Sequence, residues 1–414
     1  MKNFFRDIHL YLSLAAGIVI AIVCLTGAIL VFEKEMQQSI YPERYTVEPA
    51  GRPVPIEKMV GVLTEKVPGA KVASVKIYTD ASRTVELSYP TDKPGKKGEE
   101  KAGKSPENKT EKAAVGEGKK EGGKDKKGEK GKGGKGNNSQ AFMNPYTGEL
   151  ISLYTHRNTF FYTAFAMHRW LLNEDIGKVI VGISTIFFLF ILLTGIILWW
   201  PKNKQILKQR LTLKFDGSWK RINHDLHIVI GFYTAIFLFA FAFTGLAWSF
   251  KWFNEGIFLV TGSESKPPEP PVSVQIAGAR TISFDQAYAV AKKELPEVEF
   301  YNISLPKEPE EAITINALPK NATHERANTQ LYLDQYSGKV LQTVRFEDKN
   351  LGQRVRATFY PVHVGSIGGL PGRIIAFISC IAGFTFPITG IIMWLNRLNK
   401  KKKKKAVKKM AVVF

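Results

Sequence analysis

Four long apolar runs constrain this chain more than any other feature of its sequence. They cover approximately residues 10–32, 178–200, 228–250 and 373–395. A helix of about 20 residues is long enough to cross a bilayer core about 30 Å thick. Helices that border a globular core are usually apolar on one face only. We therefore expect a membrane protein with four transmembrane α-helices.

The first run has features of both a signal peptide and a membrane anchor. Lys2 and Arg6 precede it, as positive charges precede the apolar part of a signal peptide. The run is longer than that apolar part, and Glu33, Lys34 and Glu35 follow it in place of a small-residue cleavage site. We interpret it as an anchor that stays in the protein.

Basic residues in the short segments predict the orientation. Seven Lys and Arg residues lie between positions 202 and 221, and nine lie between positions 397 and 409. Short segments rich in Lys and Arg stay in the cytoplasm, whereas long segments cross the membrane largely regardless of charge. We expect both termini in the cytoplasm and the long segments, at about 33–175 and 251–372, outside it.

These considerations divide the chain into eight predicted segments. They are transmembrane helix one at 1–33, an outer α+β domain at 34–175, helix two at 176–201, a cytoplasmic loop at 202–224, helix three at 225–251, a second outer domain at 252–371, helix four at 372–397 and a basic cytoplasmic tail at 398–414. A Lys/Gly-rich insertion at 93–139 interrupts the first outer domain.

The insertion explains part of the net charge of +21. It holds 15 Lys against eight acidic residues and almost no apolar ones, so it cannot bury enough surface to fold. We interpret it as a disordered, solvated tether, with binding to a polyanion or a membrane surface as the alternative, and expect no nucleic-acid partner. The basic tail is expected to fix the topology and to contact anionic lipids. Cys24 and Cys380 fit no disulfide or metal-binding pattern.

The helices repeat at fixed spacings. Aligning His9 with His227 places Thr26-Gly27 and Thr244-Gly245 at the same 17 and 18 positions downstream. Aligning His168 with His363 likewise places Thr194-Gly195 and Thr389-Gly390 at the same 26 and 27 positions downstream. Equal spacings in both helix pairs indicate an internal duplication of two helices plus two.

The two outer segments repeat as well. Each opens with an amphipathic stretch, at 56–68 and 284–296, and continues with alternating strand candidates at 73–78, 84–89 and 312–316. Each then reaches a turn with Gly148 or Gly338 where a positive φ is needed. The fold class that we expect is a membrane α-helical protein with two small α+β domains outside the membrane.

The duplication sorts four histidines into two layers. His9 and His227 begin their helices on the inner side, and His168 and His363 precede theirs on the outer side. Facing histidines in a helical bundle are a usual way to hold an iron porphyrin through both axial positions. The alternatives are that these are packing residues near helix ends, or a metal site, for which two histidines per layer are few unless carboxylates join them.

Neighbouring residues suggest further roles. Gly27 and Gly245 fall in the outer layer and Gly195 and Gly390 in the inner one, because 17 residues of helix span roughly 26 Å. These glycines would leave space for a flat macrocycle, or allow close helix packing.

Asp7 and Asp225 could orient the inner imidazoles, or supply charge near a helix N-terminus. Arg157, Arg169 and Arg373 could neutralise haem propionates or an anionic chelate, or anchor the interface. His224 aligns with Arg6 rather than with His9, so we predict His227 as the ligand and keep His224 as a propionate contact, a proton relay or an alternative ligand.

At this point the sequence resembles a known family. The order IH…LTG, PYTG, HRWL…LLTGIILWWP, DLH…FTGL and VHVG…ITGIIMWLNR is similar to the PepSY-associated transmembrane helix family, over nearly all of the chain except the insertion and the tail. That family includes iron-regulated inner-membrane proteins and ferrisiderophore reductases. The resemblance implies a bacterial inner (plasma) membrane protein with outer PepSY-like domains. By position it implies two b-type haems on the four histidines.

The resulting functional hypothesis is an electron-transfer protein that reduces periplasmic ferric-siderophore iron for iron uptake, or another periplasmic iron chelate. No GxGxxG follows a strand, so the electron donor is expected to be a separate cytoplasmic reductase or membrane quinol. Two alternatives remain open. One is a non-enzymatic scaffold whose PepSY-like domains bind a peptide or protease, and the other is a haem reductase with a different acceptor.

Overall fold

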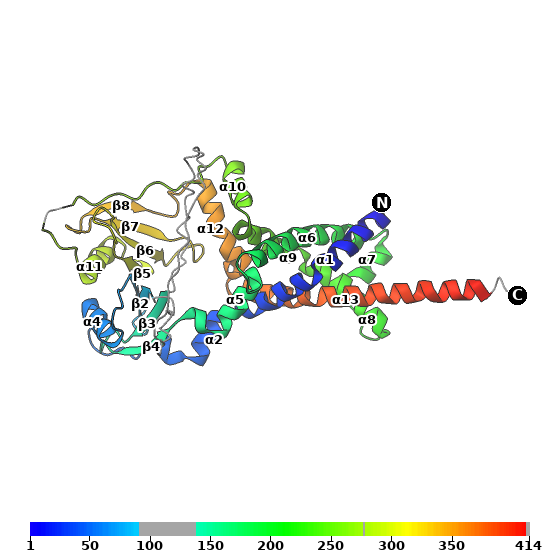
Figure 1. The fold of residues 1–414 in the computed structure, drawn as a ribbon, viewed down its shortest axis with the longest axis horizontal. Helices are drawn as coiled ribbons and strands as arrows, with labels where there is room; N and C mark the ends of the chain where they lie inside the picture. The colour runs from blue at the N-terminus through cyan, green and yellow to red at the C-terminus, as the bar shows by residue number, and fades with distance from the viewer. Residues whose placement is uncertain (91–137, 276–277, 411–414) are drawn as a thin grey trace, which may run out of the picture.

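The computed structural model describes residues 1–90, 138–275 and 278–410. Four helices in these ranges are long and apolar enough to cross a membrane (Figure 1). They cover Lys2–Val31, Ile176–Trp199, Trp219–Ser249 and Ser366–Lys400, so the four apolar runs are helices, as predicted. At most 39% of the residues in each apolar window are buried within the protein, which leaves a wide apolar surface for lipid.

These helices form one bundle. Its elements are α1 (Lys2–Val31), α6 (Ile176–Trp199), the continuous run α8 (Trp219–Asp225), η2 (Leu226–Ile230) and α9 (Gly231–Ser249), and η3 (Ser366–Gly368) followed by α13 (Gly369–Met410). Helices α1 and α9 each pack against both α6 and α13. Small residues permit the close approach: a Cβ at Gly17 would lie 3.4 Å from the ring of Pro387 on α13.

Shorter helices flank the bundle. They are α2 (Glu33–Ile40), α3 (Pro42–Tyr45), η1 (His156–Asn158), α5 (Phe160–Trp170), α7 (Lys204–Leu211), α10 (Lys251–Val260) and α12 (Leu351–His363). Helix α5 packs against α1 and α6, and α12 packs against α9, so both extend the bundle toward the sheet. Figure 1 places the N-terminus and the last turns of α13 at the opposite end. We call these two ends of the bundle the sheet end and the terminal end.

The remaining segments form a single antiparallel sheet of eight strands. Its strands are β1 (Ser74–Tyr78), β2 (Val85–Pro90), β3 (Asn138–Met143), β4 (Leu150–Tyr154), β5 (Val298–Ser304), β6 (Ile313–Pro319), β7 (Thr329–Leu333) and β8 (Val340–Val344), in the order β4-β3-β2-β1-β5-β6-β7-β8. Strands β1 and β5 pair at its centre, with Lys76 opposite Asn302. The two expected domains therefore share one sheet. Each half alone would leave β1 or β5 as an open edge, and their pairing removes both edges.

Helices α4 (Ile56–Lys66) and α11 (Phe284–Glu294) cover one face of this sheet, where the predicted amphipathic stretches lie (Figure 1). Alternate strand residues such as Val75 and Ile303 point into the core that they share with Met59 and Ala287. The turns predicted at Gly148 and Gly338 have φ of 78° and 70°.

Some segment boundaries differ from the prediction. Asn138 and Ser139 belong to β3 and not to the insertion, because they pair with β2. The predicted disorder of 93–137 lies outside the described residues. The predicted first outer domain, 34–175, also contains α5, which belongs to the bundle, and the third transmembrane helix begins at Trp219 rather than at 225.

Candidate functional site

The four repeat-related histidines form two facing pairs inside the bundle. His9 and His227 form the terminal pair, with ring centroids 6.4 Å apart and an interplanar angle of 79°. His168 and His363 form the sheet-side pair, with centroids 6.1 Å apart and an angle of 70°. Each pair takes one ring from each half of the chain, as the spacing predicted.

Different local structures carry these rings. His9 lies in the regular helix α1, whereas His227 lies in η2, a π-helical turn between α8 and α9. Single π-helical turns inside α-helices are frequent at functional sites. His168 is near the end of α5, and His363 is the last residue of α12. Both sheet-side rings are therefore carried by helices that are not among the four membrane-spanning ones.

The Thr of each Thr-Gly pair holds an imidazole by its Nδ1 atom. The contacts are His9 to Thr194 at 3.1 Å, His168 to Thr26 at 3.4 Å, His227 to Thr389 at 2.8 Å and His363 to Thr244 at 3.2 Å. Three of these Nδ1 atoms also contact a backbone carbonyl: Ile191 for His9, Val23 for His168 and Phe241 for His363, at 3.1, 2.9 and 2.8 Å. Each contact joins two helices of the same half.

These contacts fix the tautomer of the rings. A carbonyl oxygen only accepts, so Nδ1–H is the donor. The Thr hydroxyls are already donors themselves, since those of Thr26, Thr194, Thr244 and Thr389 each donate to the carbonyl four residues earlier. A neutral ring with its proton on Nδ1 has its lone pair on Nε2. Within the described residues, no protein group hydrogen-bonds to Nε2 of any of the four rings.

The glycines face these same rings. A Cβ would lie 3.1 Å from Cε1 of His168 at Gly27 and 3.2 Å from Cε1 of His363 at Gly245. The corresponding distances are 3.4 Å for both Gly195 with His9 and Gly390 with His227. The sequence had suggested that these glycines leave space for a macrocycle. The structure gives them another neighbour, because each makes room for the imidazole that its own Thr holds.

Burial keeps the sheet-side rings uncharged. It lowers the pKa of His168, and together with the neighbouring His168 it lowers the pKa of His363 to about 4. Both rings are therefore neutral at pH 7, the form whose free nitrogen can bind a metal.

The donor set fits an iron porphyrin better than a bare ion. Metal–nitrogen bonds to imidazole are about 2 Å long, so two imidazoles on opposite sides of one ion have ring centroids roughly 6 Å apart. Both pairs have this separation. Within the described ranges, no three His, Cys, Asp or Glu side chains are placed to hold a metal together. A closed zinc site needs four protein ligands, whereas a porphyrin occupies the equatorial positions and leaves two axial ones.

A cavity of about 330 Å³ surrounds the terminal pair. Apolar side chains line most of it, and His9, His227, Gly195 and Gly390 are among its walls. Arg6 and Arg397, from α1 and α13, are the charged residues of its lining. An apolar space with two arginines in its lining suits a flat, largely apolar group that carries carboxylates.

Other predicted residues lie elsewhere. His224 contacts Asp225 at 3.3 Å and does not line the cavity, and Asp225 also binds Arg221 at 2.8 Å. Asp7 pairs with Arg6 at an exposed position. The predicted orienting role of the two aspartates is therefore wrong, because threonines and carbonyls hold the imidazoles.

The three arginines expected near the outer layer have partners of their own. Arg373 pairs with Glu35, Arg169 lies over Trp170, and Arg157 lies over Tyr162. The sequence did not indicate Arg356, whose guanidinium lies 4.7 Å from the ring centroid of Trp248, a ring that is itself 5.4 Å from that of His363. The first half has no arginine at the position equivalent to Arg356, so the repeat did not single this residue out. Helix α12 places it beside Trp248.

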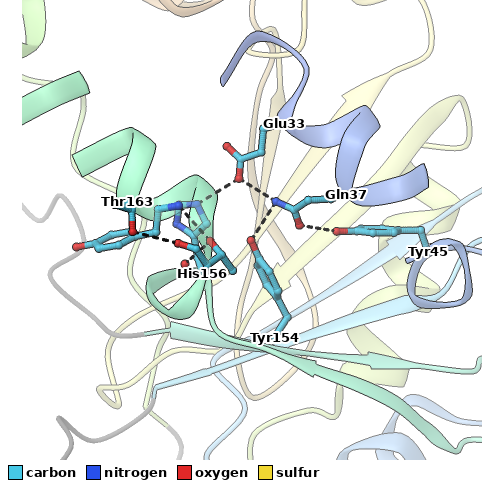
Figure 2. Close-up of polar contacts among 8 residues, drawn as sticks. Glu33, Gln37, Tyr45, Tyr154, His156 and Thr163 are labelled. Atoms are coloured by element: carbon cyan, nitrogen blue, oxygen red, sulfur yellow. Dashed lines mark hydrogen bonds and ion pairs between the residues drawn. The ribbon is translucent and has the colours of Figure 1, made fainter. Parts of the chain in front are cut away.

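Figure 2 shows a polar cluster where the bundle meets the sheet. Oε1 of Glu33 accepts from the Gln37 amide at 2.8 Å and lies 3.3 Å from Nε2 of His156. The same amide donates to the hydroxyl of Tyr154, and Tyr45 donates to the carbonyl oxygen of Gln37. The cluster joins α2 and α3 to β4 and η1.

Comparison with known proteins gives one finding. A family model described as PepSY-associated TM region matches residues 6–397. A search of curated proteins gave no match. The matched range includes all four paired histidines and all four Thr-Gly pairs.

Proposed function

The chain belongs to the PepSY-associated TM family, and from this premise we propose that this multi-pass membrane protein is an electron carrier with two b-type haems. The terminal pair, His9 and His227, holds one haem, and the sheet-side pair, His168 and His363, holds the other. One observation carries the proposal: four imidazole rings face each other in pairs, each with its Nδ1 proton held and its Nε2 atom free of hydrogen-bond partners among the described residues.

Bound haem supplies an iron that gains and loses one electron. The chain positions it. Threonine hydroxyls fix which imidazole nitrogen can bind, and groups that orient metal-bound histidines in this way raise metal affinity. Gly27, Gly195, Gly245 and Gly390 let the imidazoles approach the neighbouring helix. Arg6 and Arg397, which line the terminal cavity, would pair with the carboxylates of a group bound there.

The direction of transfer follows from the proposed topology. Both termini carry basic residues and are assigned to the cytoplasm, which places the sheet in the periplasm of the bacterial inner membrane. Electrons then enter at the terminal pair and leave at the sheet-side pair. The acceptor that we propose is a ferric siderophore or another iron chelate bound near the sheet end, because reduction to ferrous iron weakens binding by hard oxygen ligands. The equal Thr-Gly spacings support duplication as the origin of the two layers.

The test is an absorption spectrum of the purified protein in detergent, oxidised and dithionite-reduced, with haem quantified per chain. The expected result is two haems with bands typical of two axial imidazoles. His9→Ala and His168→Ala should each remove about one haem, from different layers. His324→Ala is the matched control, since this ring contacts Phe346 outside the bundle, and it should retain both.

A colourless protein after expression with adequate haem would overturn the proposal. Retention of two haems in His9→Ala and in His168→Ala would instead show that the ligands are other residues. Reduction of ferric siderophore by the dithionite-reduced protein, compared with ferric citrate, tests the acceptor separately from the haem content.

A further inference from the structure

A second apolar space opens on the outer surface of the bundle, between α6 and α9. It has a volume of about 490 Å³ and is lined by Leu192, Leu193, Ile196, Phe232, Tyr233, Ala235, Ile236 and Phe239. Leu193, Tyr233 and Ile236 are 50%, 53% and 72% exposed. Exposed positions on a membrane-spanning helix face lipid, so this groove, which we call the α6–α9 groove, is continuous with the bilayer.

The groove shares a wall with the cavity around the terminal histidine pair. Leu192, Ile196, Phe232 and Ala235 line both spaces. Phe232 also stacks on Trp199, with ring centroids 3.7 Å apart and planes within 7° of parallel. Trp199 is buried and lines only the histidine cavity. The side chains that line both spaces therefore separate a molecule in the groove from the cavity of the terminal pair.

One end of the groove is polar. The hydroxyl of Tyr233 donates to the carbonyl of Leu211, the last residue of α7, at 3.1 Å. Helix α7 carries Lys204, Lys208 and Arg210 and lies at the terminal end of the bundle (Figure 1). Tyr233 therefore sits near the membrane boundary, while Ile236 and Phe239 continue the groove toward the centre of the bilayer. The Tyr233 oxygen retains a lone pair that can accept another hydrogen bond.

We propose that the α6–α9 groove binds an isoprenoid quinol from the bilayer, with its ring beside Phe232 and Tyr233 and its tail along Ile236 and Phe239. The ligand matches the groove in each part: a hydroxyl of the quinol donates to the Tyr233 oxygen, its ring packs against Phe232, and its tail occupies the lipid-facing apolar part. A phosphatidylcholine acyl chain would fill the same apolar part, but the ester and phosphate groups near the membrane boundary have no hydrogen-bond donor for the Tyr233 oxygen.

The inference deepens the proposed function, on which its redox part rests, by naming the electron donor. Oxidation of one quinol to quinone releases two electrons and two protons. The electrons leave one at a time to the one-electron centre proposed at the terminal pair, and the protons pass to water at the membrane boundary beside α7. The quinone then returns to the bilayer through the open side of the groove.

Binding is tested first, without reliance on the haems. The protein in nanodiscs of defined phosphatidylcholine is illuminated with an azido-quinone, and labelled peptides are identified by mass spectrometry. Label is expected in the segments around 192–196 and 232–239, and excess unlabelled quinone should compete for it. Ile236→Trp fills the groove and should reduce labelling at least tenfold. Tyr233→Phe should reduce it severalfold.

The matched control is Ile183→Trp, the same substitution at an exposed position of α6 that does not line the groove, which should label as the wild type does. Equal labelling in Ile236→Trp would overturn the proposal. The proposal would also be overturned if added phospholipid displaced the label as effectively as quinone does, because the groove would then be a lipid site.

The redox part is tested by mixing the haem-loaded protein with a short-chain quinol and following reduction by absorbance. Wild type and Ile183→Trp should reduce at the same rate, and Ile236→Trp at least tenfold more slowly at unchanged haem content. If Ile236→Trp is reduced as fast as the wild type, quinol is not the donor through this groove. A wild-type protein that binds the azido-quinone but contains no haem would overturn the proposed function and leave the binding site standing.

Discussion

Gly27 and Gly245 approach their imidazoles more closely than Gly195 and Gly390 do, and this difference separates the two layers. A Cβ at 3.1 or 3.2 Å requires the neighbouring ring to move, whereas one at 3.4 Å is in ordinary van der Waals contact. His168 is also held by the carbonyl of Val23 at 2.9 Å, so it cannot move freely. An added methyl group should therefore disturb the sheet-side pair more than the terminal pair.

We predict that Gly27→Ala weakens haem binding at the sheet-side pair, while Gly195→Ala changes binding at the terminal pair less. Overpacking typically costs about 1–3 kcal/mol, which corresponds to roughly 5- to 150-fold in affinity. Haem titration of apoprotein, followed by absorbance, measures the effect. The control is Gly61→Ala on α4, where a Cβ meets nothing within 4 Å and both haem affinities should be unchanged. Equal weakening by Gly27→Ala and Gly195→Ala would contradict the argument.

At the level of residues, sequence spacing predicted which histidines meet but not how they are held. Helical rise gives the height of a residue along the bundle, so His9 and His227 could be assigned to one layer. The direction of each ring depends on rotation about the helix, and the π-helical turn at His227 changes that rotation locally. The role of Thr389 and its counterparts as imidazole acceptors could not be read from spacing. The contact between the glycines and these same imidazoles could not be read from spacing either, and their predicted role in leaving space for a macrocycle stays a prediction.

Helices α4 and α11 stabilise each other's first turns. The carboxylate of Asp285 on α11 accepts from the backbone N–H groups of Ile56 and Glu57, at 2.9 and 3.2 Å. The carboxylate of Glu57 on α4 accepts from the N–H of Phe284 at 2.6 Å. Free N–H groups and the partial positive charge at a helix N-terminus favour such carboxylates. Each half of the chain thus supplies a capping group that the other half uses.

Asp285→Ala is predicted to destabilise the sheet by about 0.5–2 kcal/mol, the usual cost of losing an N-terminal cap. Hydrogen exchange of the full-length protein in detergent should show faster exchange in the first turn of α4, although the substitution is on α11. Glu65→Ala, at an exposed position of α4, is the control and should leave exchange unchanged. If exchange becomes faster only in α11, the contact of Asp285 with the first turn of α4 does not stabilise that helix.

Local sequence patterns predicted the positions of several helices and strands, but not how the strands of the two halves pair. Amphipathic periodicity located α4 and α11, and alternation located β1, β2 and β6. Nothing local distinguishes a strand that pairs within its half from one that pairs across halves, so the pairing of β1 with β5 was not predicted. The shared core of Val75, Ile303, Met59 and Ala287 decides it, because it closes only when both halves are present.

In the whole molecule, the two halves meet in the sheet, along the bundle and at each histidine pair. Within a half, α1 holds the ring of α5 and α6 holds the ring of α1, so each half is internally tied. Between halves, every facing pair takes one ring from each. The two pairs are then roughly 26 Å apart along α1, by the rise of its 17 residues from His9 to Thr26, and under the proposed function an electron that crosses the bundle would use both.

A variant that lacks one layer should therefore conduct no electrons across the membrane, although it keeps the other layer. The variant is His168→Ala with His363→Ala. In proteoliposomes selected for one orientation, with reductant on the terminal side and a membrane-impermeant ferric chelate on the sheet side, we expect the terminal pair to retain its haem and to become reduced. Chelate reduction should fall to the level of protein-free vesicles. His324→Ala should reduce the chelate at the wild-type rate. If the double variant still transfers electrons, the two pairs do not act in series, and the sheet-side pair is not the exit.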